Sequence, residues 1–315
     1  MSVSQRYDFA AYVAKRNREG KYKGRSSSDG PADYAYTADK RMLAKLSTLV
    51  PLRMASEAYL RTYKDYWRGQ LLGATVRVGP RQFPKIFSLV SHCASTLSIP
   101  IPEVFVKQDP NINAFTYGTN EDSFIVIHSA TVDHLSEEEL INVIGHECGH
   151  IHNQHVTYYS VARDLASIGS LLMTWMIQPL TLALDAWSRR SEITADRAAL
   201  LCSRSPASAK RALVKLALGS QKLYEEVDVE EFLGQIGSIK ESIGRYGEVF
   251  LSHPYLPKRV KALELFRKSV LYRDEQSTAA EGTTAGTARG GTGGASSTTE
   301  GMGTTDGTAR GGTGG

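Results

Sequence analysis

Apolar residues recur at helical spacing along much of the chain, and short runs rich in β-branched and aromatic residues lie between them. The helical spacing predicts helices over residues 39–67, 82–97, 205–218, 227–245 and 257–272. The β-branched and aromatic runs predict strands over residues 74–78, 103–107 and 124–128. Pro51 should break or kink the first helix, because proline cannot donate the backbone hydrogen bond that a helix interior needs.

The two ends of the chain lack this spacing. Residues 1–38 are polar, and we expect them to form a loosely ordered extension before a folded domain over residues 39–275. Residues 276–315 are mostly Gly, Thr, Ala and Ser, and the segment 286–294 recurs at 307–315. Such a composition buries too little apolar surface to offset its ordering entropy. We therefore expect a disordered repeat tail.

Composition and charge narrow the class of protein. The 315 residues are 41% hydrophobic and 22% charged, which is ordinary for a globular protein. The net charge of +4 is mild, and no basic run with interleaved aromatics points to a nucleic-acid partner. Three cysteines without paired spacing do not suggest disulfides, and residues 1–14 contain no apolar run typical of a secretory signal. These features favour a cytoplasmic location.

The pattern H-E-x-x-H occupies His146 to His150, inside an apolar segment that predicts a buried helix. Residues four apart lie on one helix face, so His146 and His150 can offer their imidazoles to one metal ion. Glu147 is rotated by about 100° from His146 and can reach a metal-bound water without being a ligand. This motif is a metalloprotease signature with the Glu as general base. Ser136 can cap the helix, and Cys148 within it is expected to be a small buried side chain.

A third ligand can come from the helix predicted to run from residue 191 to Cys202. Glu192 would complete a His₂Glu set, which with an open water position is a standard catalytic zinc site. Asp196 lies on the same face as Glu192 and can accept the second N–H of a ligating histidine. The alternative is an ordinary charged helix face.

Two further segments accompany these motifs, N-A-F-x-x-G at 113–118 and H-P-x-x-x-x-R at 253–259. Their order along the chain resembles the M48 family of zinc metallopeptidases, which includes the heat-shock membrane protease and the CAAX prenyl endopeptidase. The resemblance covers residues 113–259. It implies an α+β fold, a mainly helical zincin-like (gluzincin) domain with a small antiparallel sheet beside the active-site helix.

The resemblance also implies roles for individual residues. His253 would stabilise the oxyanion of the tetrahedral intermediate, and Arg259 would orient it, pair with a carboxylate near the zinc or hold substrate. A helix-start histidine with a solvated arginine is the alternative reading. The segment that contacts the substrate main chain would comprise Asn113, Ala114 and Phe115. The alternative reading of that segment is a turn.

Two features near the motif leave alternatives open. His152 and His155 follow the histidine pair and are not expected to be ligands, although His155 is a candidate to line the cleft because some M48 members carry a histidine there. Residues 165–184 carry no charge over 20 residues, long enough to span a membrane. A single crossing would separate Glu192 from His146, so we expect packing on the catalytic domain, coverage of the cleft or peripheral contact with a membrane.

The sequence therefore predicts a metalloendopeptidase that holds one Zn²⁺ per chain through His146, His150 and Glu192 and hydrolyses protein or peptide substrates with Glu147 as general base. The alternative is a latent or non-catalytic protein, in which zinc stabilises a binding or adaptor module, or in which the N-terminal segment or residues 165–184 block the cleft.

Overall fold

The computed structural model describes residues 32–167, 171–228, 230–232, 234, 256–269 and 272. The chain divides into two units, Met1–Gln276 and Ser277–Gly315, and every described residue belongs to the first. Predictions for residues 1–31 and for the tail lie outside the described residues. The same holds for His253 and for most of the helix predicted over 227–245.

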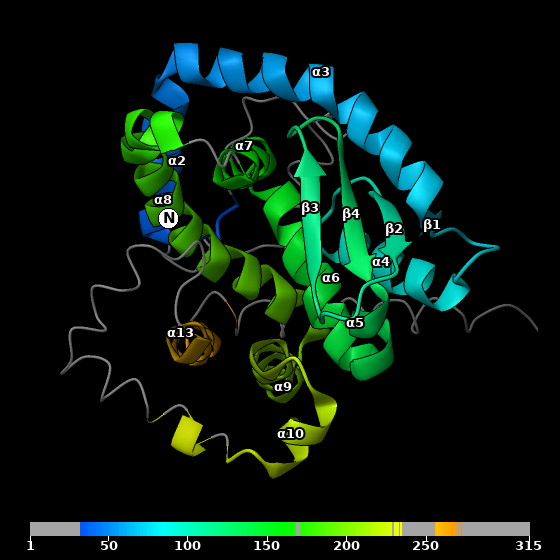
Figure 1. Ribbon diagram of the computed structural model, residues 1–315. Helices are drawn as coiled ribbons and strands as arrows, with labels where there is room; N and C mark the ends of the chain where they lie inside the picture. The colour runs from blue at the N-terminus through cyan, green and yellow to red at the C-terminus, as the bar shows by residue number, and fades with distance from the viewer. Residues whose placement is uncertain are drawn as a thin grey trace, which may run out of the picture. The chain divides into compact units, whose positions relative to one another are not determined.

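Four strands form one sheet in the order β1-β2-β4-β3 (Figure 1). Their bounds are Thr75–Arg77 for β1, Glu103–Lys107 for β2, Ala114–Gly118 for β3 and Ser123–His128 for β4. All three predicted strands are therefore present, within one residue of their expected ends. The prediction of a small sheet in a mainly helical α+β domain is confirmed.

The expectation that this sheet is wholly antiparallel is wrong for one pair. β1 pairs with β2 and β3 pairs with β4 in antiparallel fashion, but β2 and β4 are parallel. The reason is the strand order. β4 lies between β2 and β3 in the sheet. It runs opposite to β3 and therefore in the same direction as β2. The sheet is therefore mixed.

Helices cover both faces of this sheet. On one face Ile125 and Ile127 of β4 belong to the main core, and on the other face Val126 packs in a second cluster with Leu60. The alternation follows from the two-residue period of a strand. Figure 1 shows α3 running above the strands, on the side of α7. The helix bounds are α2 Thr37–Thr48, α3 Val50–Ala74, α4 Pro84–Thr96, α5 Ser129–His134, α6 Glu137–His152, α7 Val156–Ser167, α8 Leu171–Ser203, α9 Pro206–Leu218, α10 Gln221–Glu226 and α13 Leu256–Arg267.

The predicted break near Pro51 is confirmed. The helix expected over 39–67 is two helices, α2 and α3, with Leu49 between them. Pro51 lies in the first turn of α3, where no backbone N–H is needed and where its fixed φ suits the helix.

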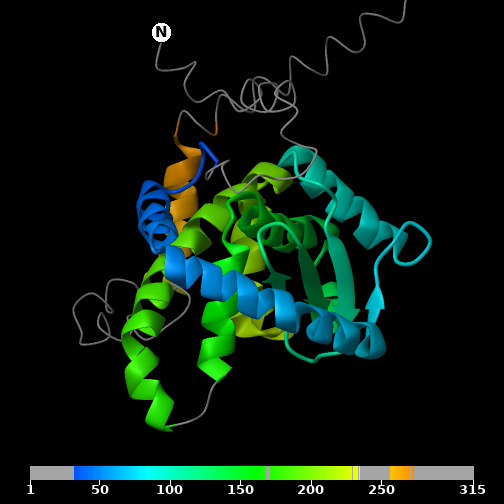
Figure 2. The same ribbon diagram turned by 90° about the horizontal axis from the view of Figure 1, so that it is seen from above.

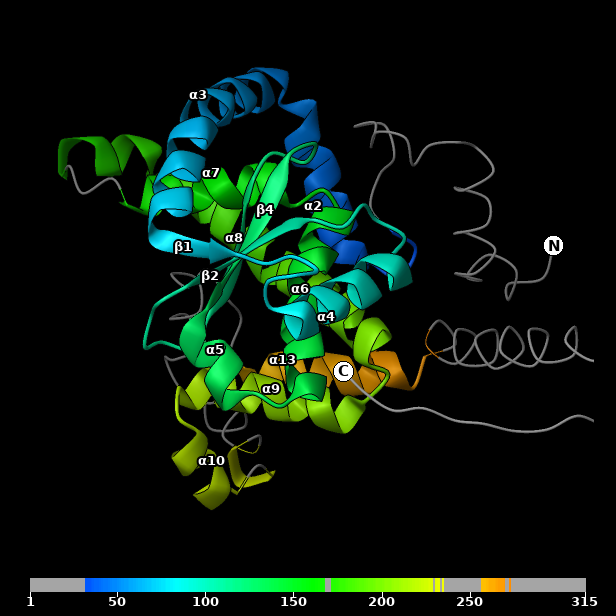
Figure 3. The same cartoon turned by 90° about the vertical axis from the view of Figure 1, so that its right-hand side faces the viewer.

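Helix α6 lies at the centre of the domain, between the sheet and α8 (Figure 1). Its N-terminus carries a capping box, in which Ser136 and Glu139 each bond the other's backbone N–H. Viewed from the side in Figure 3, α9 and α13 lie side by side beneath α6. Cys148 is fully buried in the main core, as predicted.

Two glycines let α6 and α8 approach closely. A Cβ at position 149 would lie 2.6 Å from the Cβ of Ala198, and one at position 145 would lie 3.1 Å from the Cα of Ala199. Contacts as short as the one at position 149 essentially never occur, so only glycine fits there, and a side chain at position 145 would require its neighbours to shift by a few tenths of an ångström. Gly145 and Gly149 flank the H-E-x-x-H histidines, and the close approach brings α8 within reach of them.

The described part of the predicted N-terminal extension is packed, not loose. Ala32 and Tyr34 are buried, and α2 already begins at Thr37. Tyr34 contacts the end of α6, because its hydroxyl lies 3.0 Å from His152 Nδ1 and accepts a 2.9 Å hydrogen bond from Asn153 Nδ2. The expectation of a loosely ordered extension is therefore wrong for residues 32–38.

Residues 165–184 are shared by two helices, the end of α7 and the first half of α8. Figure 2 shows these two helices projecting together from the rest of the domain. Pro179 lies inside α8. Among the helices of the described residues, none combines the length and apolarity needed to cross a bilayer.

Candidate metal centre

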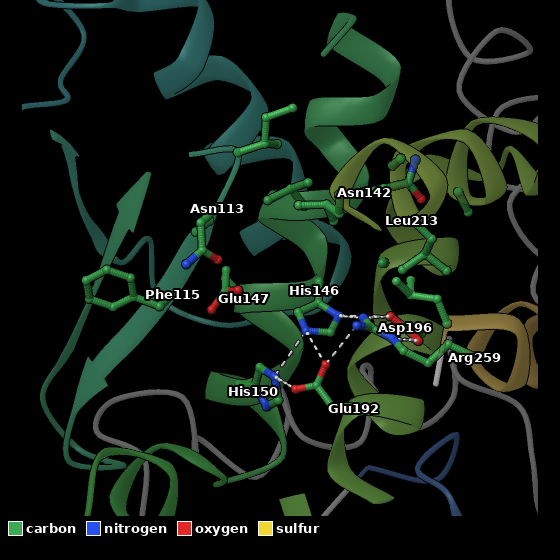
Figure 4. A pocket seen from close by; sticks show the side chains of 18 of the residues that line it. Asn113, Phe115, Asn142, His146, Glu147, His150, Glu192, Asp196, Leu213 and Arg259 are labelled. Atoms are coloured by element: carbon green, nitrogen blue, oxygen red, sulfur yellow. Dashed lines mark hydrogen bonds and ion pairs between the residues drawn. The ribbon is translucent and has the colours of Figure 1, made fainter. Parts of the chain in front are cut away.

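Three side chains from two helices converge at the centre of the domain (Figure 4). The Nε2 atoms of His146 and His150, both on α6, lie 3.2 Å apart. Glu192 on α8 places Oε2 3.5 Å from His146 Nε2 and Oε1 3.5 Å from His150 Nε2. The three potential ligand atoms all lie within 4.8 Å of one another. The structure thus brings together all three ligands predicted from the sequence.

A carboxylate contacts the ring nitrogen of His146 that faces away from the other two potential ligands. Its Nδ1 lies 3.0 Å from Asp196 Oδ1, one turn beyond Glu192 on α8. Burial alone would lower the pKa of His146, but Glu192 and Asp196 together raise it above its ordinary value. Because the carboxylate occupies the Nδ1 side, the proton of the neutral ring belongs there, and the lone pair on Nε2 faces Glu192 and His150.

Arg259 on α13 links the two acidic residues. Its guanidinium donates two hydrogen bonds to Asp196, of 2.8 Å and 2.6 Å, and its Nη1 lies 3.1 Å from Glu192 Oε2. Burial would raise the pKa of Asp196, but Arg259 holds it below its ordinary value. The H-P-x-x-x-x-R arginine therefore reaches the site, and it pairs with both carboxylates. The position of His253 lies outside the described residues.

Tyr159 on α7 was not anticipated from the sequence. Its hydroxyl donates a 2.9 Å hydrogen bond to Glu192 Oε1, and its ring lies 4.9 Å from that of His150. Burial raises the pKa of Tyr159 well above its ordinary value, and Glu192 adds to the effect. The phenol therefore remains a hydrogen-bond donor that fixes the orientation of the Glu192 carboxylate.

His150 has its own supporting pair. Its Nδ1 lies 3.1 Å from the Nδ1 of His155, whose Nε2 lies 3.0 Å from Asp39 Oδ2 on α2. His155 and Asp39 are both fully buried. The expectation that His155 lines the cleft is wrong, because the residue lies behind His150 and is absent from the described lining of the cavity.

Glu147 is held between α6 and the sheet. The hydroxyl of Thr116 on β3 donates a 2.7 Å hydrogen bond to Glu147 Oε2. Figure 4 shows Glu147 on the side of His146 that faces β3, with Asn113 next to it. Glu147 does not belong to the group of potential ligands in the described residues. Thr116 is a second site residue that the sequence did not reveal.

A cavity of about 630 Å³ opens beside these groups. Asn113, Ala114 and Phe115 line it at the sheet. The opposite wall is mostly apolar and comes from α6, α8, α9 and α13. Its members include Val143, Ala199, Ala212, Leu213, Leu216, Leu256 and Leu263. The cavity thus joins the histidine pair to the three residues predicted to meet a substrate.

The donor set fits a divalent metal such as zinc. Two neutral imidazole nitrogens and a carboxylate are ligands that zinc accepts, and three protein ligands leave a coordination position open toward the cavity. Both histidines have their second ring nitrogen bound by a buried partner, as ligating histidines usually do.

A mainly helical α+β fold with this cluster beside an open cavity is that of a metallopeptidase, and comparison with known proteins agrees. Residues 80–266 match the sequence model described as "Peptidase family M48". The chain therefore belongs to peptidase family M48, and the resemblance noted from its motifs is confirmed.

Individual relatives extend the match. The chain is 29% identical over 255 residues to "Plastoglobule-localized metallopeptidase 48, chloroplastic" of Arabidopsis thaliana, which covers 76% of this chain and 74% of that protein. It is 27% identical over 224 residues to "Protease HtpX homolog" of Streptococcus gordonii, covering 59% of this chain and 75% of that protein. The "Protease HtpX homolog" of Streptococcus pyogenes is 26% identical over 225 residues, with the same coverage.

Proposed function

We propose that the protein is a zinc-dependent metalloendopeptidase. The observation that carries the proposal is the convergence of His146, His150 and Glu192 beside a cavity into which Glu147 also faces. Zinc bound there would lower the pKa of a water ligand to about 7 and polarise the scissile carbonyl. A peptidase also needs a base and a place for the substrate main chain, and this chain offers both.

Glu147 is the proposed general base. It would take a proton from the attacking water and pass it to the leaving amine, a role that contributes roughly 10²–10⁴-fold in rate. Thr116 binds Oε2, which leaves Oε1 as the oxygen available to the water. Tyr159, Asp196 and Arg259 would hold the ligands in place, and His253 remains the proposed oxyanion-stabilising residue.

Strand β3 offers an edge for the substrate main chain. It pairs only with β4 among the described strands. Asn113 O accepts a hydrogen bond from His128 N, on the β4 side, so by alternation the backbone groups of Ala114 and Thr116 point to the outer edge. An extended peptide added to this edge would lie beside Glu147. We therefore propose Ala114 as the main-chain partner of the substrate, with Asn113 and Phe115 lining the cavity.

The test is cleavage of casein or a fluorogenic peptide by the purified protein. We expect a chelator to abolish cleavage and Glu147→Gln to lower kcat by about 10²–10⁴-fold while zinc content stays at one per chain. Glu138→Gln is the matched control, because Glu138 lies on the same helix but its side chain is exposed and pairs with Arg211. Full activity of Glu147→Gln would refute the mechanism.

The competing proposal is a zinc-stabilised binding or adaptor protein. Zinc content does not separate the two readings, but cleavage that a chelator inhibits does. A purely structural site would close all four coordination positions with side chains, whereas three potential ligands face a cavity here. The cytoplasmic location and a peripheral contact of residues 165–184 with a membrane stay predictions.

A further inference from the structure

The side of His150 that faces away from the cavity meets a buried chain of polar groups that reaches helix α2. His150 Nδ1 contacts His155 Nδ1 at 3.1 Å, and His155 Nε2 lies 3.0 Å from Asp39 Oδ2. The second contact is short but does not have the geometry of a hydrogen bond. Both His155 and Asp39 have no solvent-exposed surface, so water does not compete for these contacts.

When both rings are neutral, the order of the groups determines which nitrogen of each ring carries the proton. A carboxylate can only accept a hydrogen bond, so the N–H of a neutral His155 faces Asp39 and its Nδ1 presents a lone pair. His150 must then donate its Nδ1–H to that lone pair. The Nε2 of His150 is left as the lone pair that faces His146 and Glu192.

We infer that Asp39 and His155 are positioning residues for the metal ligand His150. They correspond to Asp196 and Arg259, which hold His146 from the other side of the site. The inference rests on the proposed metal site, but it adds residues that no comparison assigns. Asp39 lies outside the region that matches the family, residues 80–266.

Asp39 is itself held by helix α8. Trp187 Nε1 donates a 3.0 Å hydrogen bond to Asp39 Oδ1, and Thr194 Oγ1 donates a 2.6 Å hydrogen bond to Oδ2. The Trp187 ring packs edge-on against His155, with centroids 5.5 Å apart. Each oxygen of the carboxylate thus accepts a hydrogen bond from α8, which holds Asp39 in place beside His155. Helix α2 therefore forms part of the proposed metal centre through Asp39.

The experiment measures zinc affinity by competition with a chromogenic chelator, and stability by thermal unfolding of the metal-free protein. We expect Asp39→Asn to weaken zinc binding by about 10–100-fold, the usual effect of removing a partner of a ligating histidine. Glu139→Gln is the matched control. Glu139 is an equally buried carboxylate on α6, but it pairs with Lys215 and Arg211 and touches no potential ligand. Its loss should lower stability and leave zinc affinity unchanged.

A second pair of variants separates positioning from packing. His155→Asn keeps a hydrogen-bond acceptor on Cγ, where the ring has Nδ1, whereas His155→Leu removes the acceptor and fills much of the same space. Both variants lose the ring contact with Trp187 and should lose stability. We expect only His155→Leu to lose about 10–100-fold in zinc affinity.

The outcomes distinguish this inference from the proposed function. Wild-type protein that binds no zinc would refute both. Wild-type protein that binds one zinc, with unchanged affinity in Asp39→Asn and in His155→Leu, would overturn the positioning role and leave the proposed function standing. Equal losses of affinity in His155→Asn and His155→Leu would also overturn it, because they would trace the effect to packing.

Discussion

The glycine between Cys148 and His150 offers a direct test of how the fold builds the site. Gly149→Ala would place a Cβ 2.6 Å from the Cβ of Ala198 and 3.1 Å from the Cα of Ala195. Ordinary van der Waals contact begins near 3.4 Å. The helices α6 and α8 would have to separate by about 0.8 Å, the difference between 2.6 Å and 3.4 Å, because both sides of the contact are stiff.

The expected change in the free energy of unfolding is the sum of two opposing effects. Overpacking a tight contact costs about 1–3 kcal/mol, while alanine in place of a helical glycine gains up to about 1 kcal/mol. Gly69→Ala in α3 isolates the second effect, because a Cβ at position 69 would meet nothing within 4 Å. We expect Gly69→Ala to raise the free energy of unfolding. The free energy of unfolding of Gly149→Ala should be about 1–3 kcal/mol lower than that of Gly69→Ala.

The separation of α6 and α8 should also weaken metal binding. Metal–ligand distances tolerate only about 0.2 Å, so a shift of about 0.8 Å between His150 and Glu192 should weaken zinc binding at least about tenfold. Urea unfolding of the metal-free variants gives the stability, and chelator competition gives the affinity. If Gly149→Ala proved as stable as Gly69→Ala, the close packing would be refuted. Lower stability with wild-type zinc affinity would refute its link to the site.

Three further predictions address single contacts. Thr116→Val keeps the side-chain shape but removes the donor to Glu147 Oε2, and we expect kcat to fall about tenfold at unchanged zinc content in a peptide-cleavage assay. Asp196→Asn should weaken zinc binding about 10–100-fold in chelator competition, and an unchanged affinity would show that His146 needs no partner. Removing zinc should lower Tm, because zinc at 100 times its Kd stabilises by about 2.7 kcal/mol, and a Tm that EDTA leaves unchanged would contradict a link between α6 and α8 through the metal.

The parts of the site that the sequence predicted are those set by helical period. His146 and His150 are four residues apart on α6, and Glu192 and Asp196 are four residues apart on α8, so each pair shares a face whatever the rest of the fold. Three of the four strands were also predicted, because their β-branched and aromatic residues are a local signal, whereas β3 was left open between a strand and a turn. The parallel pairing of β2 with β4 was not predicted, because it depends on the order in which the strands assemble.

The contacts that escaped prediction join elements far apart in the chain. Asp39 meets His155 across 116 positions, and Tyr159 meets Glu192 across 33. No spacing rule relates such residues, and each is an ordinary residue type in its own segment. Asp39 lay at the boundary assigned to a loose extension, because the polar character of residues 1–38 hides the burial of Ala32 and Tyr34. Burial by tertiary contact cannot be read from polarity alone.

Helix α8 connects the uncharged stretch 165–184, for which no role is assigned, to the candidate metal centre. Its first half carries the end of the uncharged stretch 165–184, and its second half carries Glu192 and Asp196. At 1.5 Å per residue, Pro179 and Glu192 are separated by only about 20 Å of helix. Trp187 lies between them, fully buried and hydrogen-bonded to Asp39. Asp39, which contacts His155, therefore also binds α8 five residues before Glu192, so this carboxylate connects the helices on the two sides of the candidate metal centre.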